Sequence, residues 1–198
     1  KLGGNAFDAM IATELALAVT YPVAGNIAGG GFMVYRTQNG AVGALDYREK
    51  APLRATRNMY LDKKGDFISE KSKLGALAVG VPGTVAGIFE VYKKFGSLPL
   101  DQLFKPVIDL AKNGHIITSK QASRLNQFKK IIKDVNSEES LYTQNYKEGD
   151  TLKNVALANT LIRISKNGRK EFYEGETART MVDYLDSKNG IITLKDFK

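Results

Sequence analysis

Arg48 is the residue of this sequence whose type and position point most directly to chemistry. It follows the nearly apolar segment 41–47 (AVGALDY), which we expect to be the second arm of a β-hairpin inside a sheet. A guanidinium in such a place is costly to desolvate unless an anion meets it. Position alone leaves two interpretations open, an internal ion pair or contact with an anionic ligand.

The glycine-rich loop 25–31 (GNIAGGG) is the second candidate, because such loops often cradle phosphates. A Walker loop needs Lys and then Ser or Thr after its last glycine, followed by a helix. Here the loop leads into Phe32-Met33-Val34, which is predicted to be a strand. We therefore expect a tight crossing between a buried helix and the sheet, not a phosphate site.

The titratable residues form no other clear constellation. His115 is the single histidine, and the sequence cannot locate the carboxylate that a general base would need, so we expect a surface histidine. Asp46 and Glu49 are placed to flank a site at the end of a strand. The remaining acidic pairs are typical of solvated loops and do not indicate glycosidase chemistry, at positions 138, 139, 174 and 176.

Composition excludes several classes of function. The 198 residues contain no cysteine, which removes disulfides, thiolate zinc sites and cysteine nucleophiles, and one histidine gives no cluster for a metal. The net charge of +8 lacks the aromatic and basic clusters or the zinc-finger and helix-turn-helix signatures of nucleic-acid binding, so we expect a solvated basic surface. The apolar run 6–19 is too short to span a membrane. The first residues lack the features of a signal peptide, so the protein is either cytosolic or has lost its start.

The elements that must position these residues are mostly helices, so the expected fold class is α+β. A hairpin is predicted over 32–47 around Asn39-Gly40, and its nearly apolar arms indicate a sheet that is covered on both faces. A short strand is predicted over 74–83. Helix caps, stops and apolar spacing predict helices at 5–19 with Asn5 as N-cap, 84–95 before Gly96, 101–112, just after Ser119 to about 135, 151–166 and 175–187.

Several longer strings resemble the large subunit of gamma-glutamyltranspeptidases. The strongest are residues 3–36, 44–52 (ALDYREKAP) and 78–96 (AVGVPGTVAGIFEVYKKFG), and weaker similarity continues through 100–118, 172–178 and 190–197. The resemblance implies an N-terminal nucleophile hydrolase fold, a four-layer αββα sandwich. It also implies that residues 1–198 are a partial large-subunit domain, truncated at both ends.

The resemblance also implies an activity. Such enzymes transfer or hydrolyse the γ-glutamyl group of glutathione and related amides, through a γ-glutamyl ester of a threonine exposed when the precursor cleaves itself. That threonine lies on the small subunit, so the expected partners are this subunit and a γ-glutamyl substrate such as glutathione. The isolated chain is expected to be inactive. No metal or organic cofactor is implied, and the family's location is periplasmic or secreted.

Two residues carry over from the family's Arg-Glu-x-Ala-Pro string. Its arginine pairs with the α-carboxylate of the substrate, which assigns this role to Arg48, and Glu49 is expected to position Arg48. The loop 25–31 and the string 80–83 match structural motifs without assigned chemistry. The alternatives are a cephalosporin acylase, a poly-γ-glutamate transpeptidase, or a non-catalytic scaffold of the same fold.

Overall fold

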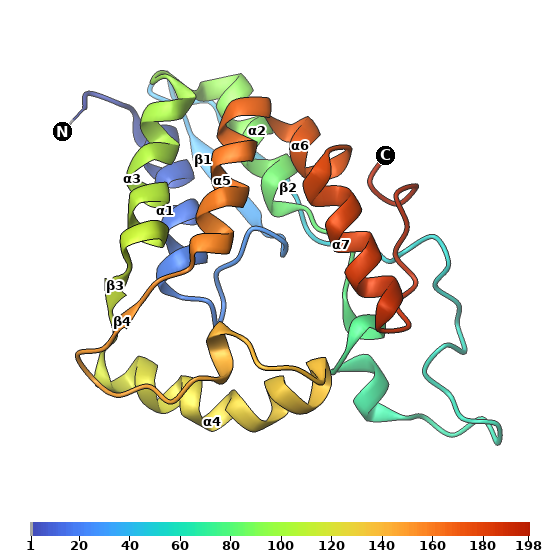
Figure 1. The fold of residues 1–198 in the computed structure, drawn as a ribbon. Coiled ribbons are helices and arrows are strands. Elements are labelled where there is room, and N and C mark those ends of the chain that lie inside the picture. Colours follow the sequence, from blue (N-terminus) through green and yellow to red (C-terminus); the bar gives the residue numbers. More distant parts are fainter. Residues whose placement is uncertain (1) are drawn as a thin grey trace.

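A computed structural model describes residues 2–198, in which helices are the main regular elements and two short sheets accompany them (Figure 1). The strands pair in antiparallel fashion as β1 (Phe32–Arg36) with β2 (Val42–Asp46), and β3 (His115–Ile116) with β4 (Thr151–Leu152). The helices are α1 (Ala6–Thr20), α2 (Thr84–Phe95), α3 (Leu100–Asn113), α4 (Ser119–Asn136), α5 (Val155–Asn167), α6 (Arg169–Tyr173) and α7 (Glu176–Ser187). The mixture confirms the α+β class, whereas the four-layer sandwich is not seen in the described residues.

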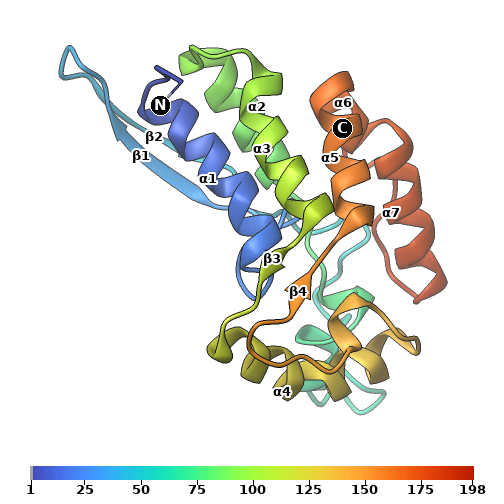
Figure 2. The ribbon, with the colours of Figure 1, turned by 60° about the vertical axis from the view of Figure 1, so that its left-hand side comes forward.

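Helix α1 begins where its sequence predicts. The Asn5 side chain accepts hydrogen bonds from the backbone N–H of Phe7 and Asp8, and Asp8 accepts one in return from the Asn5 N–H. The buried Asp8 carboxylate also accepts from the N–H groups of Ser97 and Leu98. One capping box thus ties α1 to the connection between α2 and α3. Helix α1 packs against both of these helices (Figure 2).

The main core lies between α1, α2, α3, α5, α6 and α7, and the inner face of the β1–β2 hairpin packs against it. The inward side chains include Met33, Tyr35 and Leu45, and Tyr35 lies in an aromatic cluster with Phe7 and Phe95. These contacts fix which face of the hairpin is turned toward the helices.

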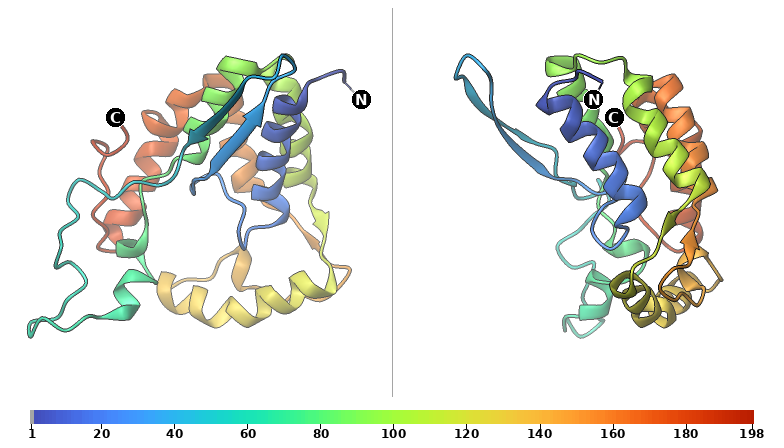
Figure 3. Two further views of the ribbon diagram at one scale, coloured as in Figure 1. Left: turned by 180° about the vertical axis from the view of Figure 1, so that it is seen from behind. Right: turned by 90° about the vertical axis from the view of Figure 1, so that its left-hand side faces the viewer.

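The outer face of the hairpin is exposed, which corrects our expectation that both faces are covered. Val34 is 85% exposed, Val42 77% and Phe32 65%, and Figure 3 shows helices on one side of the hairpin alone. The arms are apolar at positions of both faces, so periodicity could not distinguish a covered face from an uncovered one. Among residues 2–198, no element packs over this outer face.

Helix α4 forms a separate unit below the main core, joined to it by the β3–β4 ribbon (Figure 1). A second, smaller core consists of Ile117, Ala122, Leu125 and Leu152. The Gln121 side chain donates to the Thr20 carbonyl at the end of α1, 2.7 Å away. The described helices include none long and apolar enough to cross a membrane.

Two local predictions were wrong, and one short helix was missed. Residues 74–83 form a 3₁₀ turn at Ala76–Ala78 and a single bridge between Lys50 and Val81, because glycines and a proline interrupt the run. Helix α5 starts after its N-cap Asn154, since residues 151–152 pair with β3. The short helix α6 was not predicted at all.

Candidate functional site

Arg48 lies on a segment whose backbone is paired on both sides. Before it, the Tyr47 N–H donates to the Gly31 carbonyl (2.9 Å), and the Gly31 N–H donates back at 3.4 Å. After it, Lys50 and Val81 exchange backbone hydrogen bonds of 3.2 and 2.8 Å. Arg48 therefore sits between two anchored positions, one on the glycine-rich loop and one on the turn that precedes α2.

The approach of these segments depends on glycine. A Cβ at Gly83 would lie 1.9 Å from the Tyr47 carbonyl oxygen, and one at Gly30 would lie 2.7 Å from the same atom. The glycine-rich loop is also hydrogen-bonded to the start of α2, because the N–H groups of Gly83 and Thr84 both donate to the Gly29 carbonyl, at 2.8 and 2.9 Å. No larger residue fits at position 83 without displacing the backbone that carries Arg48.

This geometry refines the predicted role of the glycine-rich loop. Gly25 does meet the buried helix, since a Cβ there would lie 2.6 Å from the carbonyl carbon of Leu17 in α1. The glycines at 29–31 instead pack against the segment that follows β2. Gly25 thus allows the loop to approach the helix, but no strand lies there, so the predicted crossing of helix and sheet is not found at this glycine, and the triple glycine approaches the Arg48 segment.

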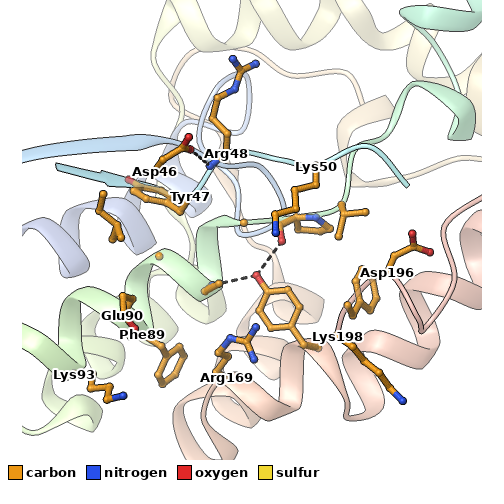
Figure 4. Close-up of a pocket in the computed structure, with 18 of the residues that line it drawn as sticks. Asp46, Tyr47, Arg48, Lys50, Phe89, Glu90, Lys93, Arg169, Asp196 and Lys198 are labelled. Carbon is orange, nitrogen blue, oxygen red and sulfur yellow. Dashed lines mark hydrogen bonds between the residues drawn. The ribbon is translucent and has the colours of Figure 1, made fainter. Parts of the chain in front are cut away.

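The Arg48 side chain is exposed, which corrects the expectation of a guanidinium inside a sheet. Strand β2 ends at Asp46, whose carboxylate accepts a hydrogen bond from the Arg48 N–H at 2.9 Å. Among residues 2–198 the guanidinium makes no ion pair, and its carbon lies 5.7 Å from the Phe32 ring centroid. Figure 4 shows the side chain directed away from Arg169. The internal ion pair is therefore not found among the residues that the structure describes, and the ligand role of Arg48 stays a prediction.

Glu49 is exposed and, within the described chain, makes no ion pair with Arg48. A Cβ at Gly80 would lie 2.9 Å from the Glu49 Cβ, and a Cβ at Gly29 would lie 3.5 Å from the Glu49 Oε1. The Glu49 side chain thus lies between the glycine-rich loop and the turn before α2. Its predicted role in positioning Arg48 stays a prediction.

Two cavities adjoin the Arg48 segment, and Arg48 and Lys50 line both. One, of about 900 Å³, lies between β2, α2, α6 and the last residues (Figure 4), and the other, of about 520 Å³, lies between residues 48–60 and 77–80. The larger cavity carries Arg169, whose guanidinium carbon lies 4.5 Å from the Tyr173 ring centroid. Lys50 and Arg169 were missed as lining residues, although Lys50 lies in the same motif as Arg48.

The other titratable candidates lie away from the Arg48 segment or are engaged. His115 lines a small separate cavity beside Leu125, and it is half-buried, with its Nδ1 atom buried and without a hydrogen-bond partner among the described residues. Burial lowers its pKa below the usual value. Glu139 pairs with Lys133. The part of the chain that the structure describes holds no group of three or more His, Cys, Asp or Glu side chains suited to a metal.

Comparison with known proteins gives a consistent result along the whole chain. The sequence profile of the family described as gamma-glutamyltranspeptidase matches residues 1–198. The glutathione hydrolase proenzyme of Escherichia coli is 40% identical over 99% of this chain and 34% of its own length. The proenzyme of Pseudomonas aeruginosa is 44% identical over 99% of this chain and 35% of its own length.

Solved structures agree with the sequence relatives. The crystal structure of Helicobacter pylori gamma-glutamyltranspeptidase matches with a TM-score of 0.93 and 44% identity, covering 98% of this chain and 57% of that one. The Bacillus anthracis transpeptidase CapD matches at 0.76 with 31% identity, covering 99% and 60%. The chain thus spans about a third of the length of the curated relatives described above.

Proposed function

Because the chain belongs to the gamma-glutamyltranspeptidase family, we propose that it is part of an enzyme that transfers or hydrolyses the γ-glutamyl group of glutathione and related amides. The chain's contribution to that reaction is recognition of the substrate. One observation carries this assignment: an exposed guanidinium that makes no ion pair within residues 2–198 stands on a backbone segment that is anchored on both sides.

Arg48 is proposed to bind the free α-carboxylate of the γ-glutamyl substrate. A guanidinium presents two parallel N–H groups to a carboxylate, and a charge-assisted contact of this kind contributes about 1.5–3 kcal/mol. A γ-linked glutamate leaves its α-carboxylate free, whereas an ordinary peptide bond consumes that group. The contact therefore selects γ-glutamyl amides over ordinary peptides.

The bond-breaking group is proposed to be a threonine at the N-terminus of the small subunit, exposed by self-cleavage of the precursor. Its hydroxyl attacks the γ-carbonyl while its own α-amine takes the proton. The resulting α-ammonium gives that proton to the leaving nitrogen as the C–N bond breaks, which yields a γ-glutamyl ester and a free amine. Water or an acceptor amine then takes the glutamyl group. Arg48 contributes by holding the substrate's other end, which fixes where the γ-carbonyl lies relative to the hydroxyl.

The small subunit is also proposed to complete the sandwich. The exposed apolar face of the hairpin, with Phe32, Val34 and Val42, suits a second layer of sheet packed against it. We also propose that the enzyme is periplasmic or secreted, the location expected from its resemblance to the family.

The comparisons bear unequally on the alternative activities. The CapD transpeptidase and the Bacillus halodurans cephalosporin acylase match with TM-scores of 0.76 and 0.83, at 31% and 25% identity. The Helicobacter pylori enzyme exceeds both on each measure, at 0.93 and 44%. This favours the γ-glutamyltransferase activity over the two alternative activities. A complete precursor that does not cleave itself would instead favour the non-catalytic scaffold.

Kinetics of the complete enzyme test the role of Arg48. Arg48→Ala is expected to raise KM for a γ-glutamyl anilide roughly 10- to 150-fold, the value of the lost carboxylate contact, while self-cleavage proceeds as before. Arg179→Ala, at an exposed position of α7 that lines neither cavity beside Arg48, is the matched control and is expected to leave KM unchanged. An unchanged KM in Arg48→Ala removes this residue from the substrate site.

A further inference from the structure

The Tyr47 ring is enclosed by two glycines from different elements. A Cβ at Gly87 in α2 would lie 2.4 Å from Cγ and 2.6 Å from Cδ2 of the ring. A Cβ at Gly31, just before β1, would lie 2.9 Å from Cε2 and 3.0 Å from the hydroxyl oxygen. Such distances are too short for real Cβ atoms, so the ring occupies space that only glycine leaves free.

The hydroxyl of Tyr47 does not explain this enclosure. In the described chain it forms no hydrogen bond within 3.5 Å, whereas the buried Tyr173 hydroxyl forms two. Burial raises the pKa of the Tyr47 phenol, and the charge of Glu14 on α1 raises it further, so the group stays neutral in any ordinary assay. What Tyr47 contributes is therefore the volume of its ring.

That volume acts on the backbone next to Arg48. The Tyr47 N–H and carbonyl are the groups paired with Gly31, and its carbonyl is the atom that approaches Gly83. The ring therefore sets the distance between the end of β2 and helix α2. Arg48 is bonded directly to this residue, so a shift of Tyr47 displaces the origin of the guanidinium.

We propose that Tyr47 is a positioning residue, whose ring, seated between Gly31 and Gly87, holds Arg48 where it meets the α-carboxylate of a γ-glutamyl substrate. This inference rests on the proposed function of Arg48 and assigns to the two glycines a purpose that the motif alone did not supply. It predicts that ring volume at position 47, and not the hydroxyl, governs affinity for the donor substrate.

The test is steady-state kinetics of the complete enzyme with a γ-glutamyl anilide, with active sites titrated so that kcat refers to mature enzyme. Tyr47→Leu, which loses the ring, is expected to raise KM about tenfold and to keep kcat within about threefold of the parent enzyme. The reason is that a displaced Arg48 guanidinium retains only part of its binding free energy for the substrate carboxylate. Tyr47→Phe, which keeps the ring, is expected to match the parent enzyme. Tyr47→Leu added to Arg48→Ala is expected to raise KM no further, because Tyr47 acts through Arg48.

Two glycine variants separate positioning from general destabilisation. Gly87→Ala pushes the ring and is expected to raise KM as Tyr47→Leu does. Gly96→Ala crowds a different ring, since its Cβ would lie 2.5 Å from Cδ2 of Tyr92 at the other end of α2, and it is expected to leave KM unchanged. KM does not depend on the fraction of enzyme that matures, so KM can still be compared for a variant that gives a poor yield of mature enzyme.

The outcomes distinguish this inference from its premise. If Arg48→Ala raises KM while Tyr47→Leu and Gly87→Ala leave it within twofold, the positioning role is refuted and the proposed function stands. If Arg48→Ala itself leaves KM unchanged, the proposed function fails first. A KM increase in Tyr47→Phe equal to that in Tyr47→Leu would assign the effect to the hydroxyl and also refute the inference.

Discussion

The Tyr173 hydroxyl supports the turn to which the Arg48 segment is hydrogen-bonded, so its removal tests how this turn is stabilised. Tyr173 on α6 is 4% exposed, and its hydroxyl donates to the Pro82 carbonyl at 3.0 Å and accepts from the Ala86 N–H at 3.1 Å. Tyr173→Phe removes one oxygen and leaves both backbone groups without this partner. The carbonyl belongs to the turn before α2, and the N–H belongs to the first turn of α2.

The magnitude follows from the cost of buried polar groups that lose a partner. Each such loss costs about 1–3 kcal/mol, and two groups share one lost hydroxyl here, so we expect the free energy of unfolding to fall by about 2 kcal/mol. The complete relatives are about three times as long as this chain, and for a protein of that size the loss corresponds to a decrease of about 2 °C in Tm. Tyr35→Phe is the matched control, because among the described residues the Tyr35 hydroxyl makes no hydrogen bond, and we expect a change of less than about 0.5 kcal/mol.

Thermal unfolding of the complete enzyme, followed by circular dichroism, measures both variants. The expected result is a clear decrease in Tm for Tyr173→Phe and almost none for Tyr35→Phe. Equal shifts in the two variants would show that the paired hydrogen bonds of Tyr173 do not stabilise the turn. The reasoning that α6 supports the Arg48 segment through this hydroxyl would then be wrong.

Three further predictions concern stability. Glu171→Gln is expected to reduce the loss of stability below about pH 4.5. Burial opposes ionisation of Glu171, but hydrogen bonds from Thr177 and the charge of Arg163 outweigh it and lower the pKa of this carboxyl. The stability that the ionised Glu171 contributes is therefore lost as the pH falls through its pKa in the folded protein. Urea unfolding at several pH values measures this. His115→Leu is expected to reduce the loss of stability between pH 7 and 5, because burial lowers the histidine pKa and protonation favours the unfolded state; the same titration measures it. Asn5→Ala is expected to cost about 1 kcal/mol of α1 capping, seen as a lower urea midpoint.

Helix positions were predictable because their signals are local. Asn5 caps α1 with its own side chain, and Gly96 follows the last residue of α2, as the sequence indicates. The β3–β4 ribbon was not predictable, since each strand has two residues and their pairing joins positions more than thirty residues apart. The run at 74–83 was ambiguous because short apolar stretches fit strands and turns alike.

The sequence predicted which residue lies at the candidate site, but it did not predict the geometry of that site. Resemblance identified Arg48, while the desolvation argument placed its guanidinium inside a sheet. The structure ends β2 at Asp46, two residues before Arg48, and exposes the Arg48 side chain, which depends on tertiary contacts that no local pattern encodes. Likewise, the glycines at 31 and 87 are far apart in sequence, and only the fold shows that both border one ring.

The exposed guanidinium and the exposed face of the hairpin are adjacent features. Phe32, which lies under the Arg48 guanidinium, is the first residue of the outward row that continues through Val34. A charge pair in open solvent contributes only about 0–1 kcal/mol, and the same pair strengthens when protein replaces the surrounding water. A subunit that covers the outer face therefore also encloses Arg48. Under the proposed function, substrate recognition and assembly depend on the same surface, and Arg48 reaches its full affinity for a carboxylate only in the assembled enzyme.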